Sequence, residues 1–378
     1  MPRPVYLDYA ADMPVLECVK AEMFRVIQLD CGNAAALHTW GHRAHEIMEE
    51  ARVSVARLIG AEPDEVIFVS GGSEANNAVM ESFRGQRVAI SSIEHPSVLE
   101  AAKVRAREMV QIPVDEWGRV RVDDVPSRVD LVSVMLANNE LGTIEPVQEV
   151  VAYGHRHGML VHTDATQAVG KMHINVKELG VDYLTLSAHK FGGPIGVGAL
   201  YVRMGAPYRS LVLGGHQENG QRAGTSNVVG IAGLGAAAKW CWDEWSCKKW
   251  QSVAGLRDEL KSRILAEVPY SSCNSPAEGC LPNILNMSFR GAEGESIQLY
   301  LDAEGIAVGT GSACASGDIR PSHVLMAARG DAEVAHSSIR FSLGIETTRA
   351  DIMRVMEVLP KVVRKLQGMS TIKVKARG

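Results

Sequence analysis

The chain is poor in aromatic residues and in cysteine, and it has no apolar run long enough to span a bilayer. Aromatic residues make up 5% of its 378 residues, and its seven cysteines include no C-x-x-C pair. An odd cysteine count, in a long chain whose N-terminus lacks the apolar region of a secretory signal, favours free thiols in a reducing compartment. We therefore predict a cytoplasmic protein with no membrane partner. Six cysteines are expected to be small apolar fillers, and one is a candidate for chemistry.

The chain also lacks an excess of charge of either sign. It has 39 Lys and Arg against 44 Asp and Glu, which gives a formal net charge of −5. This balance gives no reason to expect direct contact with nucleic acid or a polybasic membrane surface. Basic residues do concentrate between 361 and 377, a pattern typical of a solvated helix face and a frayed tail. No metal site is predicted.

What the sequence does contain is a recurring order of short apolar strand, Gly-rich or polar turn, and helix. The pattern predicts a helix over 74–83 and strands over residues 65–70, 87–91, 130–136, 159–163, 183–187 and 198–202. Strands this apolar, alternating with helices, indicate an α/β protein with a mostly parallel sheet covered on both faces.

After about residue 250 the pattern changes to that of a smaller α+β unit. It predicts helices over 253–268 and 349–366 and short strands over 283–288 and 338–342. A chain of this length exceeds what one hydrophobic core usually covers. We therefore predict a large domain over 15–252, and a small domain made of 1–14 and 253–378.

The residues best suited to chemistry follow the predicted strands, where ligands bind in open parallel sheets. Gly71, Gly72 and Ser73 lie between a strand and a helix. Two glycines let the backbone approach an anion, and the helix N-terminus offers free N–H groups. The same residues would also serve as a plain turn with a serine cap, and the sequence does not decide between the two.

Asp164 and Lys190 follow two further strands, and Lys190 precedes a Gly-Gly-Pro loop. A desolvated lysine is a good nucleophile for carbonyls because burial lowers its pKa. A lysine Schiff base together with an aspartate at a pyridinium nitrogen is the arrangement that pyridoxal 5'-phosphate requires. The pair therefore predicts that cofactor.

Two further candidates are His95 and Cys314. His95 follows a predicted strand, where an imidazole would be a stacking partner for a pyridine ring, although a lone histidine is often just an ordinary polar residue. Cys314 lies among small residues over 309–318, which predicts a mobile surface loop and an exposed thiol. Taken alone, it is better explained as a surface cysteine without a role.

In order and spacing, these segments resemble the cysteine desulfurases, a branch of the class V aminotransferase family of fold-type I pyridoxal-phosphate enzymes. The resemblance covers nearly the whole chain, and the extension of the cysteine loop to 321–325 is similar to the long-loop group. The matching segments are 6–11 (YLDYAA), 32–33 with 37–38 (GN and LH), 70–77 (SGGSEANN), 94–96 (EHP), 138–146 (NNELGTIEP), 164–167 (DATQ), 187–190 (SAHK), 222–225 (RAGT) and 311–314 (GSAC).

The resemblance implies a fold-type I transferase with a seven-stranded sheet, and it implies a role for each matching residue. Lys190, Cys314 and His95 would be catalytic, and His95 would also stack on the cofactor ring. The other cofactor-binding residues would be Gly72, Ser73, Asn139, Asp164, Gln167, Ser187, His189 and Thr225, the last reaching the cofactor of a neighbouring subunit in a homodimer. Asn33, Asn139 and Arg340 would bind the substrate, with Arg340 clamping its carboxylate.

The implied reaction converts L-cysteine to L-alanine and leaves the sulfur as a persulfide on Cys314. An acceptor protein would then take the sulfur for iron–sulfur cluster assembly, tRNA thiolation or DNA phosphorothioation. Two alternatives stay open: another pyridoxal-phosphate aminotransferase or lyase in which Cys314 is incidental, and a non-catalytic scaffold of a sulfur-transfer complex. The acceptor and the selectivity for cysteine over selenocysteine are not predicted.

The chain departs from the family at the N-terminal edge of the expected site. The family usually reads Ala-Thr-Thr-Pro where this chain has Ala11, Asp12, Met13 and Pro14. We therefore expect this edge to differ in polarity.

Overall fold

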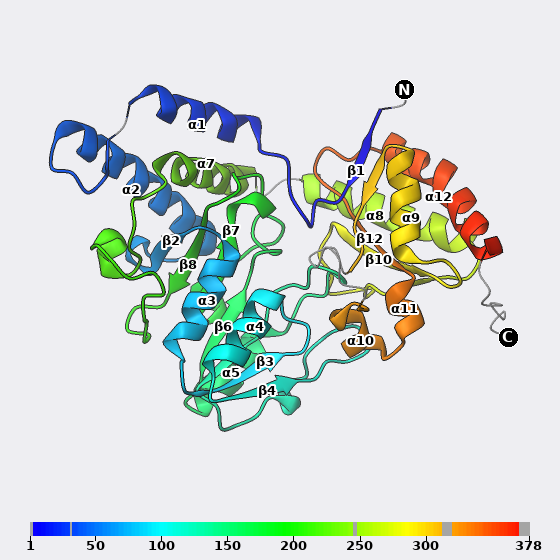
Figure 1. Cartoon of the computed structure of the whole chain (residues 1–378), viewed down its shortest axis with the longest axis horizontal. Helices are drawn as coiled ribbons and strands as arrows, with labels where there is room; N and C mark the ends of the chain where they lie inside the picture. The colour runs from blue at the N-terminus through cyan, green and yellow to red at the C-terminus, as the bar shows by residue number, and fades with distance from the viewer. Residues whose placement is uncertain (1–2, 31, 245–247, 312–319, 370–378) are drawn as a thin grey trace.

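The computed structural model describes residues 3–30, 32–244, 248–311 and 320–369, which form two lobes (Figure 1). The larger lobe is built on a seven-stranded sheet in the order β2-β8-β7-β6-β5-β3-β4. Its strands are β2 (Val66–Val69), β3 (Arg87–Ser91), β4 (Glu108–Ile112), β5 (Leu131–Ser133), β6 (Leu160–Asp164), β7 (Tyr183–Ser187) and β8 (Gly198–Val202). β8 runs antiparallel to both of its neighbours, β2 and β7, and the remaining pairs of strands are parallel. The prediction of an α/β fold with a mostly parallel sheet is confirmed.

Helices cover both faces of this sheet, as its apolar strands require. Alternate residues of β2 point to opposite sides, with Val66 and Phe68 in one core and Ile67 and Val69 in the other. The large-lobe helices are α1 (Glu17–Gln28), α2 (Thr39–Ile59), α3 (Gly72–Ser82), α4 (Pro96–Arg105), α5 (Val147–Arg156), α6 (Val176–Leu179) and α7 (Val228–Glu244). The α3–α4 face and the α2–α5–α7 face thus enclose the two cores.

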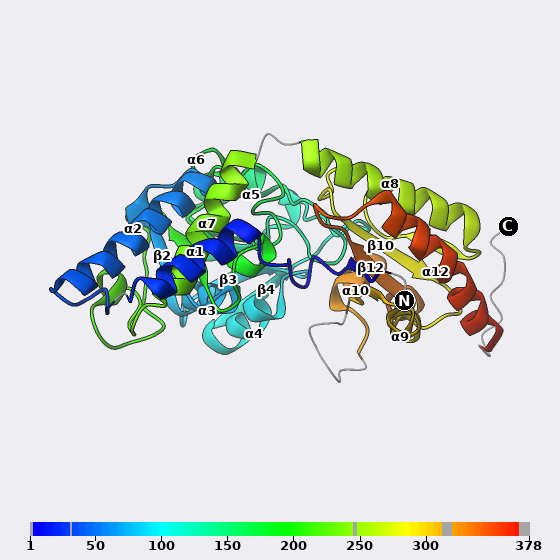
Figure 2. The same cartoon turned by 90° about the horizontal axis from the view of Figure 1, so that it is seen from above.

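The smaller lobe has its own core around Phe289 and Phe341. Its sheets have the strand orders β12-β10-β9 and β1-β11. The strands are β1 (Val5–Leu7), β9 (Ser271–Cys273), β10 (Ile284–Phe289), β11 (Ile306–Val308) and β12 (Ser338–Ser342). The helices are α8 (Lys248–Glu267), α9 (Gly294–Ala303), α10 (His323–Arg329), α11 (Ala332–His336) and α12 (Arg349–Met369). Figure 2 shows α8 and α12 running alongside each other over this lobe.

The N-terminal segment connects the lobes. β1 pairs in parallel with β11, with Val5 opposite Ile306, and Val5 and Leu7 pack in the core of the small lobe. Residues 8–14, which we call the strap, then cross to the large lobe, where α1 begins (Figures 1 and 2). The domain bounds 15–252 and 253–378 stay a prediction.

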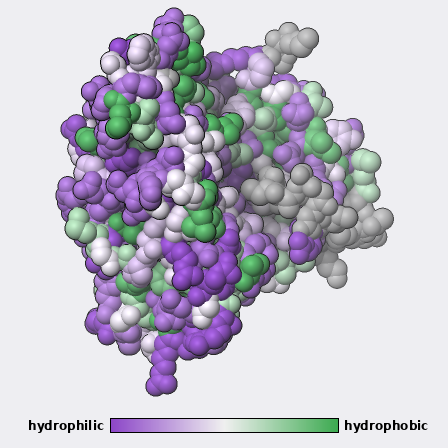
Figure 3. Space-filling view, turned by 60° about the vertical axis from the view of Figure 1, so that its left-hand side comes forward, coloured by the Kyte–Doolittle hydropathy of each residue, from purple (hydrophilic) through white to green (hydrophobic). Residues whose placement is uncertain are grey.

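No helix among the described residues is long and apolar enough to cross a membrane. The face seen in Figure 3 mixes hydrophilic and hydrophobic side chains, without one continuous apolar area. Large apolar side chains are nevertheless exposed on and between α1 and α2, where Phe24, Leu37 and Trp40 are 60%, 91% and 56% exposed.

Candidate active site

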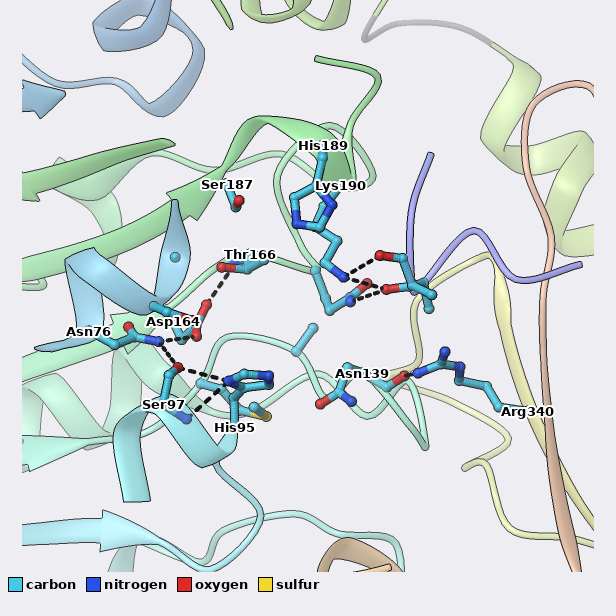
Figure 4. A pocket seen from close by; sticks show the side chains of 17 residues that line it. Asn76, His95, Ser97, Asn139, Asp164, Thr166, Ser187, His189, Lys190 and Arg340 are labelled. Atoms are coloured by element: carbon cyan, nitrogen blue, oxygen red, sulfur yellow. Dashed lines mark hydrogen bonds between the residues drawn. The ribbon is translucent and has the colours of Figure 1, made fainter. Parts of the chain in front are cut away.

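A cavity of about 310 Å³ lies at the carboxyl ends of β6 and β7 and at the N-termini of α3 and α4 (Figure 4). Most of the residues predicted for the site line it, although they come from segments far apart in the chain. These are Gly72, Ser73, His95, Asn139, Asp164, Gln167, Ser187, His189, Lys190 and Arg340. Parallel strands bring these segments to one edge of the sheet, which is why reasoning from strand ends located them.

Asp164 ends β6 and is held by two neutral donors. Asn76 Nδ2 donates to Asp164 Oδ2 at 2.8 Å, and the backbone N–H of Thr166 donates to Oδ1 at 2.9 Å. The side chain is buried, at 6% exposed. Hydrogen bonds to a carboxylate favour its charged form, so this arrangement holds a negative charge at the cavity.

His95 caps the N-terminus of α4 with its own ring. The backbone N–H of Ser97 donates to His95 Nδ1 at 3.1 Å, and Ser97 Oγ lies 2.7 Å from the same nitrogen. Asn76 Nδ2 donates to that hydroxyl at 2.9 Å, which leaves the hydroxyl proton free to point at Nδ1. Because Nδ1 accepts, the neutral ring carries its proton on Nε2.

Burial lowers the pKa of His95, and the charge of Asp164 opposes that effect while Lys190 and His323 add to it. The ring is therefore held in its neutral form. Its Nε2 is then a hydrogen-bond donor.

Lys190 lies in a 3₁₀ turn directly after β7, opposite the strap. Its Nζ donates to the carbonyls of Ala10 and Ala11 at 2.9 and 2.6 Å. Gln167 Nε2 donates to Ala10 O at 2.8 Å as well. The backbone of the strap thus forms one side of the cavity, next to the predicted cofactor lysine.

A second lysine, Lys171, donates hydrogen bonds to the backbone of this turn and of a neighbouring loop. Lys171 is 4% exposed, and its Nζ donates to the carbonyls of Gln167 at 3.0 Å and Lys190 at 3.1 Å. Burial lowers the pKa of Lys171 to about 7, and the nearby Lys190 adds to the effect. Lys171 therefore joins the two loops that carry Gln167 and Lys190.

Arg340, on β12, brings a guanidinium from the small lobe into the cavity. Its Nη2 donates to Asp8 Oδ1 at 2.8 Å and its Nη1 donates to Asn139 O at 3.0 Å. Its Nε is buried and has no partner among the described residues. The guanidinium is thus fixed in place and retains donors for an anion.

Buried polar atoms without a partner gather at this cavity. Among the described residues, the cavity-lining ones are Asn76 Oδ1, Thr166 Oγ1, Gln167 Oε1 and Arg340 Nε. Buried polar groups nearly always have a partner, so this cluster indicates a polar ligand.

The chemistry of the cavity fits pyridoxal 5'-phosphate. Lys190 supplies an amine for its aldehyde, and Asp164 a negative charge for its ring nitrogen. The N-terminus of α3, with Gly72 and Ser73, supplies donors for its phosphate. Gly71 has a φ of 154°, a conformation that favours glycine. A Cβ at Gly72 would come within 3.2 Å of Thr166 Oγ1.

Two predicted residues lie elsewhere, and a third is not among the described residues. Asn33 lies between α1 and α2, where its Oδ1 accepts the backbone N–H of Ala35, and it does not line the cavity. Thr225 lines a separate cavity with Ser70 and Arg222. Cys314 lies outside the described residues, so its predicted loop and role stay predictions.

Sequence reasoning missed Asn76, Ser97, Thr166 and Lys171. Asn76, Ser97 and Thr166 lie within or next to segments whose resemblance to the family is noted above, and Lys171 lies four residues after one of them. Asn76 links Asp164, on β6, to Ser97, on α4, across 88 and 21 residues of sequence. Only the fold shows that contact.

Comparison with known proteins gives the family. Residues 5–355 match the family described as Aminotransferase class-V. The cysteine desulfurase IscS of Dictyoglomus turgidum is 43% identical over 99% of this chain and 98% of its own. The cysteine desulfurase of Gluconacetobacter diazotrophicus is 40% identical over 97% of this chain and 95% of its own.

Comparison with solved structures gives the same family. A NifS-like protein superposes with a TM-score of 0.86 and 34% identity over 97% of this chain and 99% of its own. A structure described as SspA in complex with cysteine gives a TM-score of 0.78 and 29% identity over 91% of this chain and 100% of its own. The chain belongs to the aminotransferase class-V family, in its cysteine desulfurase branch, and its cofactor is pyridoxal 5'-phosphate. The family, the fold and the cofactor predicted from the sequence are confirmed.

Proposed function

We propose that this protein removes sulfur from free L-cysteine, releases L-alanine and leaves the sulfur as a persulfide on Cys314. One observation carries the proposal: a single cavity joins the amine of Lys190, the carboxylate of Asp164 and a guanidinium donor of Arg340 that has no partner among the described residues. The curated relatives named cysteine desulfurase support the same reaction, and SspA, a structural neighbour, has been solved with cysteine.

When bound, pyridoxal 5'-phosphate supplies an electron-accepting ring that stabilises negative charge at the substrate Cα. Lys190 would hold the cofactor and move the Cα proton, since its Nζ reaches the cavity beside the strap carbonyls. Asp164 would keep the ring nitrogen protonated. Arg340, fixed by Asp8 and Asn139 O, would bind the substrate carboxylate through its remaining N–H groups.

Sulfur transfer would follow at the rim of the cavity. The thiolate of Cys314 attacks the substrate sulfur, the Cβ–S bond breaks, and Cβ takes a proton to give alanine. The described residues on either side of the Cys314 segment support this reach. Ser322 Oγ donates to Glu140 Oε2 at 2.5 Å, and the same oxygen leaves no room for a Cβ at Gly311. Glu140 directly follows Asn139, which lines the cavity.

Three residues of chain from Gly311 to Cys314 can span at most about 10 Å. Cys314 is therefore within that distance of Gly311, which lies beside Glu140.

Replacing Cys314 by Ala tests the proposal. With cysteine and a thiol acceptor, we expect alanine release by Cys314→Ala to fall to background while cofactor absorbance stays at the wild-type level. Cys18→Ala, which removes an exposed free thiol elsewhere, is the matched control and should be fully active. Undiminished alanine release by Cys314→Ala would refute the assignment and favour a lyase in which Cys314 is incidental.

We further propose that the active unit is a homodimer. Thr225 and Asn33 lie apart from the cavity of their own chain, and Leu37 and Trp40, near Asn33, are exposed apolar residues that a second copy would cover. Thr225 would then complete the phosphate site of the partner. The four described cysteines, all free thiols, support a cytoplasmic location.

The sulfur would pass to an acceptor protein. The routes that fit a protein persulfide are iron–sulfur cluster assembly, tRNA thiolation and DNA phosphorothioation. The relatives named IscS support sulfur transfer without selecting among these routes.

A further inference from the structure

Asp12, where the chain departs from its family, contacts a residue of the cofactor site. Its Oδ1 lies 2.9 Å from His189 Nδ1, and the two side chains form an ion pair when the ring is protonated. His189 lines the cavity beside Ser187, at the end of β7. The threonine usual at this position would carry no charge.

The backbone holds the two residues in register. The N–H of Met13 donates to the carbonyl of His189 at 3.0 Å, and the hydroxyl of Tyr6 donates to the carbonyl of Asp12 at 2.9 Å. The peptide group between Asp12 and Met13 is thus held at both its N–H and its carbonyl. The carboxylate of Asp12 faces the ring because of this anchoring.

His189 receives opposing charges from its surroundings. Burial, together with Lys190 and Lys171, lowers the pKa of His189 below its ordinary value, and the hydrogen bond to Asp12 and its charge offset only part of that effect. Asp12 is the acidic group that acts on this ring. Nδ1 is engaged with Asp12, and among the described residues His189 Nε2 has no hydrogen-bond partner.

From this geometry we propose that Asp12 is a positioning residue that favours the imidazolium form of His189 when the cofactor phosphate lies beside the ring, so that its Nε2–H donates to that phosphate. The inference rests on the phosphate role proposed for His189. When the Nδ1–H of an imidazole donates to a carboxylate, Nε2 also carries a proton only in the imidazolium form. A charged donor binds a phosphate dianion more tightly than a neutral donor does.

The test compares two ligands and two pH values on apoenzyme from which the cofactor has been removed. Dissociation constants are measured for pyridoxal 5'-phosphate and for pyridoxal, which lacks the phosphate. Asp12→Asn keeps an oxygen near Nδ1 and removes only the charge. We expect it to weaken pyridoxal 5'-phosphate binding roughly 3- to 10-fold at pH 8, less at pH 6, and to leave pyridoxal binding unchanged.

Asp12→Glu should restore part of the affinity, because it restores the charge. Glu17→Gln, which removes an exposed carboxylate paired with Lys20 nearby, is the matched control and should change nothing. The ³¹P chemical shift of the bound cofactor should titrate at lower pH in Asp12→Asn.

His189→Gln separates the two proposals. If it leaves the affinity for pyridoxal 5'-phosphate unchanged, the phosphate role of His189 is wrong and the inference is wrong with it. If His189→Gln weakens that affinity but Asp12→Asn behaves like Glu17→Gln, only the role of Asp12 is wrong. Equal weakening of both ligands by Asp12→Asn would also overturn the inference, since it would indicate a general structural effect.

Discussion

The two histidines that line the cavity have opposite kinds of hydrogen-bond partner. In the sheet wall, made of Asn76, His95, Ser97 and Asp164, the ring of His95 meets the N–H and hydroxyl of Ser97. In the strap wall, His189 and Lys190 line the cavity, with Asp12 and Lys171 in contact behind them, and the ring of His189 meets the carboxylate of Asp12. Donors stabilise a neutral imidazole, and a carboxylate stabilises a charged one.

Burial has the largest effect on both rings and lowers the pKa of each, so the difference between the two histidines comes from the hydrogen-bond partner of each ring. At His95 the hydrogen bonds from Ser97 act in the same direction as burial, and at His189 Asp12 acts against it. Each wall can be tested by removing one partner.

The largest expected effect comes from the strap wall, at Lys190. Lys190→Ala removes the amine that would hold the cofactor, so we expect alanine release to fall by roughly 10³-fold or more. The absorbance of lysine-bound cofactor should vanish in the same sample. Lys177→Ala, at an exposed lysine paired with Glu62, should keep both. Retention of that absorbance in Lys190→Ala would mean that another amine holds the cofactor.

A moderate effect is expected in the sheet wall, at Ser97. Ser97→Ala removes one donor to Nδ1, so the neutral ring loses stabilisation and the pKa of His95 should rise. The acidic limb of the pH–rate profile should then move to higher pH, and kcat should fall roughly 3- to 10-fold near neutral pH. Ser97→Thr keeps the hydroxyl and should restore the wild-type profile. A profile that moves to lower pH in Ser97→Ala would contradict the neutral tautomer of His95.

The smallest effect concerns stability, at Lys171. Its pKa is lowered from 10.5 to about 7, so between these values the unfolded chain binds more protons than the folded one. Stability therefore rises with pH across that window in the wild type. Lys171→Met removes this rise and leaves two carbonyls without their donor. We expect its loss of Tm to be larger at pH 9 than at pH 6, as measured by thermal unfolding of apoenzyme. A uniform loss at both pH values would show that Lys171 is charged when folded.

The sequence predicted the strands of the large lobe well because they are short, apolar and bounded by turns. β3, β7 and β8 have the predicted bounds. β4 escaped prediction because Glu108 and Gln111 interrupt its apolar pattern at the edge of the sheet. β1 and β11 have three residues each and form only by pairing with each other, so local sequence carries no signal for them.

The residues of the site also fall into those that the sequence predicts and those that it does not. Lys190, Asp164 and His95 could be predicted because strand ends converge at one edge of a parallel sheet. Their partners could not, because Asn76 and Asp12 act through contacts between elements distant in sequence. Ser97 is only two residues from His95, but it contacts the ring because the His95 side chain caps α4. Asp12 was noticed only as a departure, and its contact with His189 spans 177 residues.

The strap also constrains when the site can form during synthesis. β1 pairs with β11, so that Val5 lies opposite Ile306, which comes 301 positions later in the sequence. The N–H of Ala10 donates to Ser342 Oγ. Residues 5–14 leave the ribosome before their partners, which are made about 300 residues later. The carbonyls that meet Lys190 therefore settle only after the strands of the small lobe have emerged. A truncated nascent chain would hold the lysine without the wall that completes its pocket.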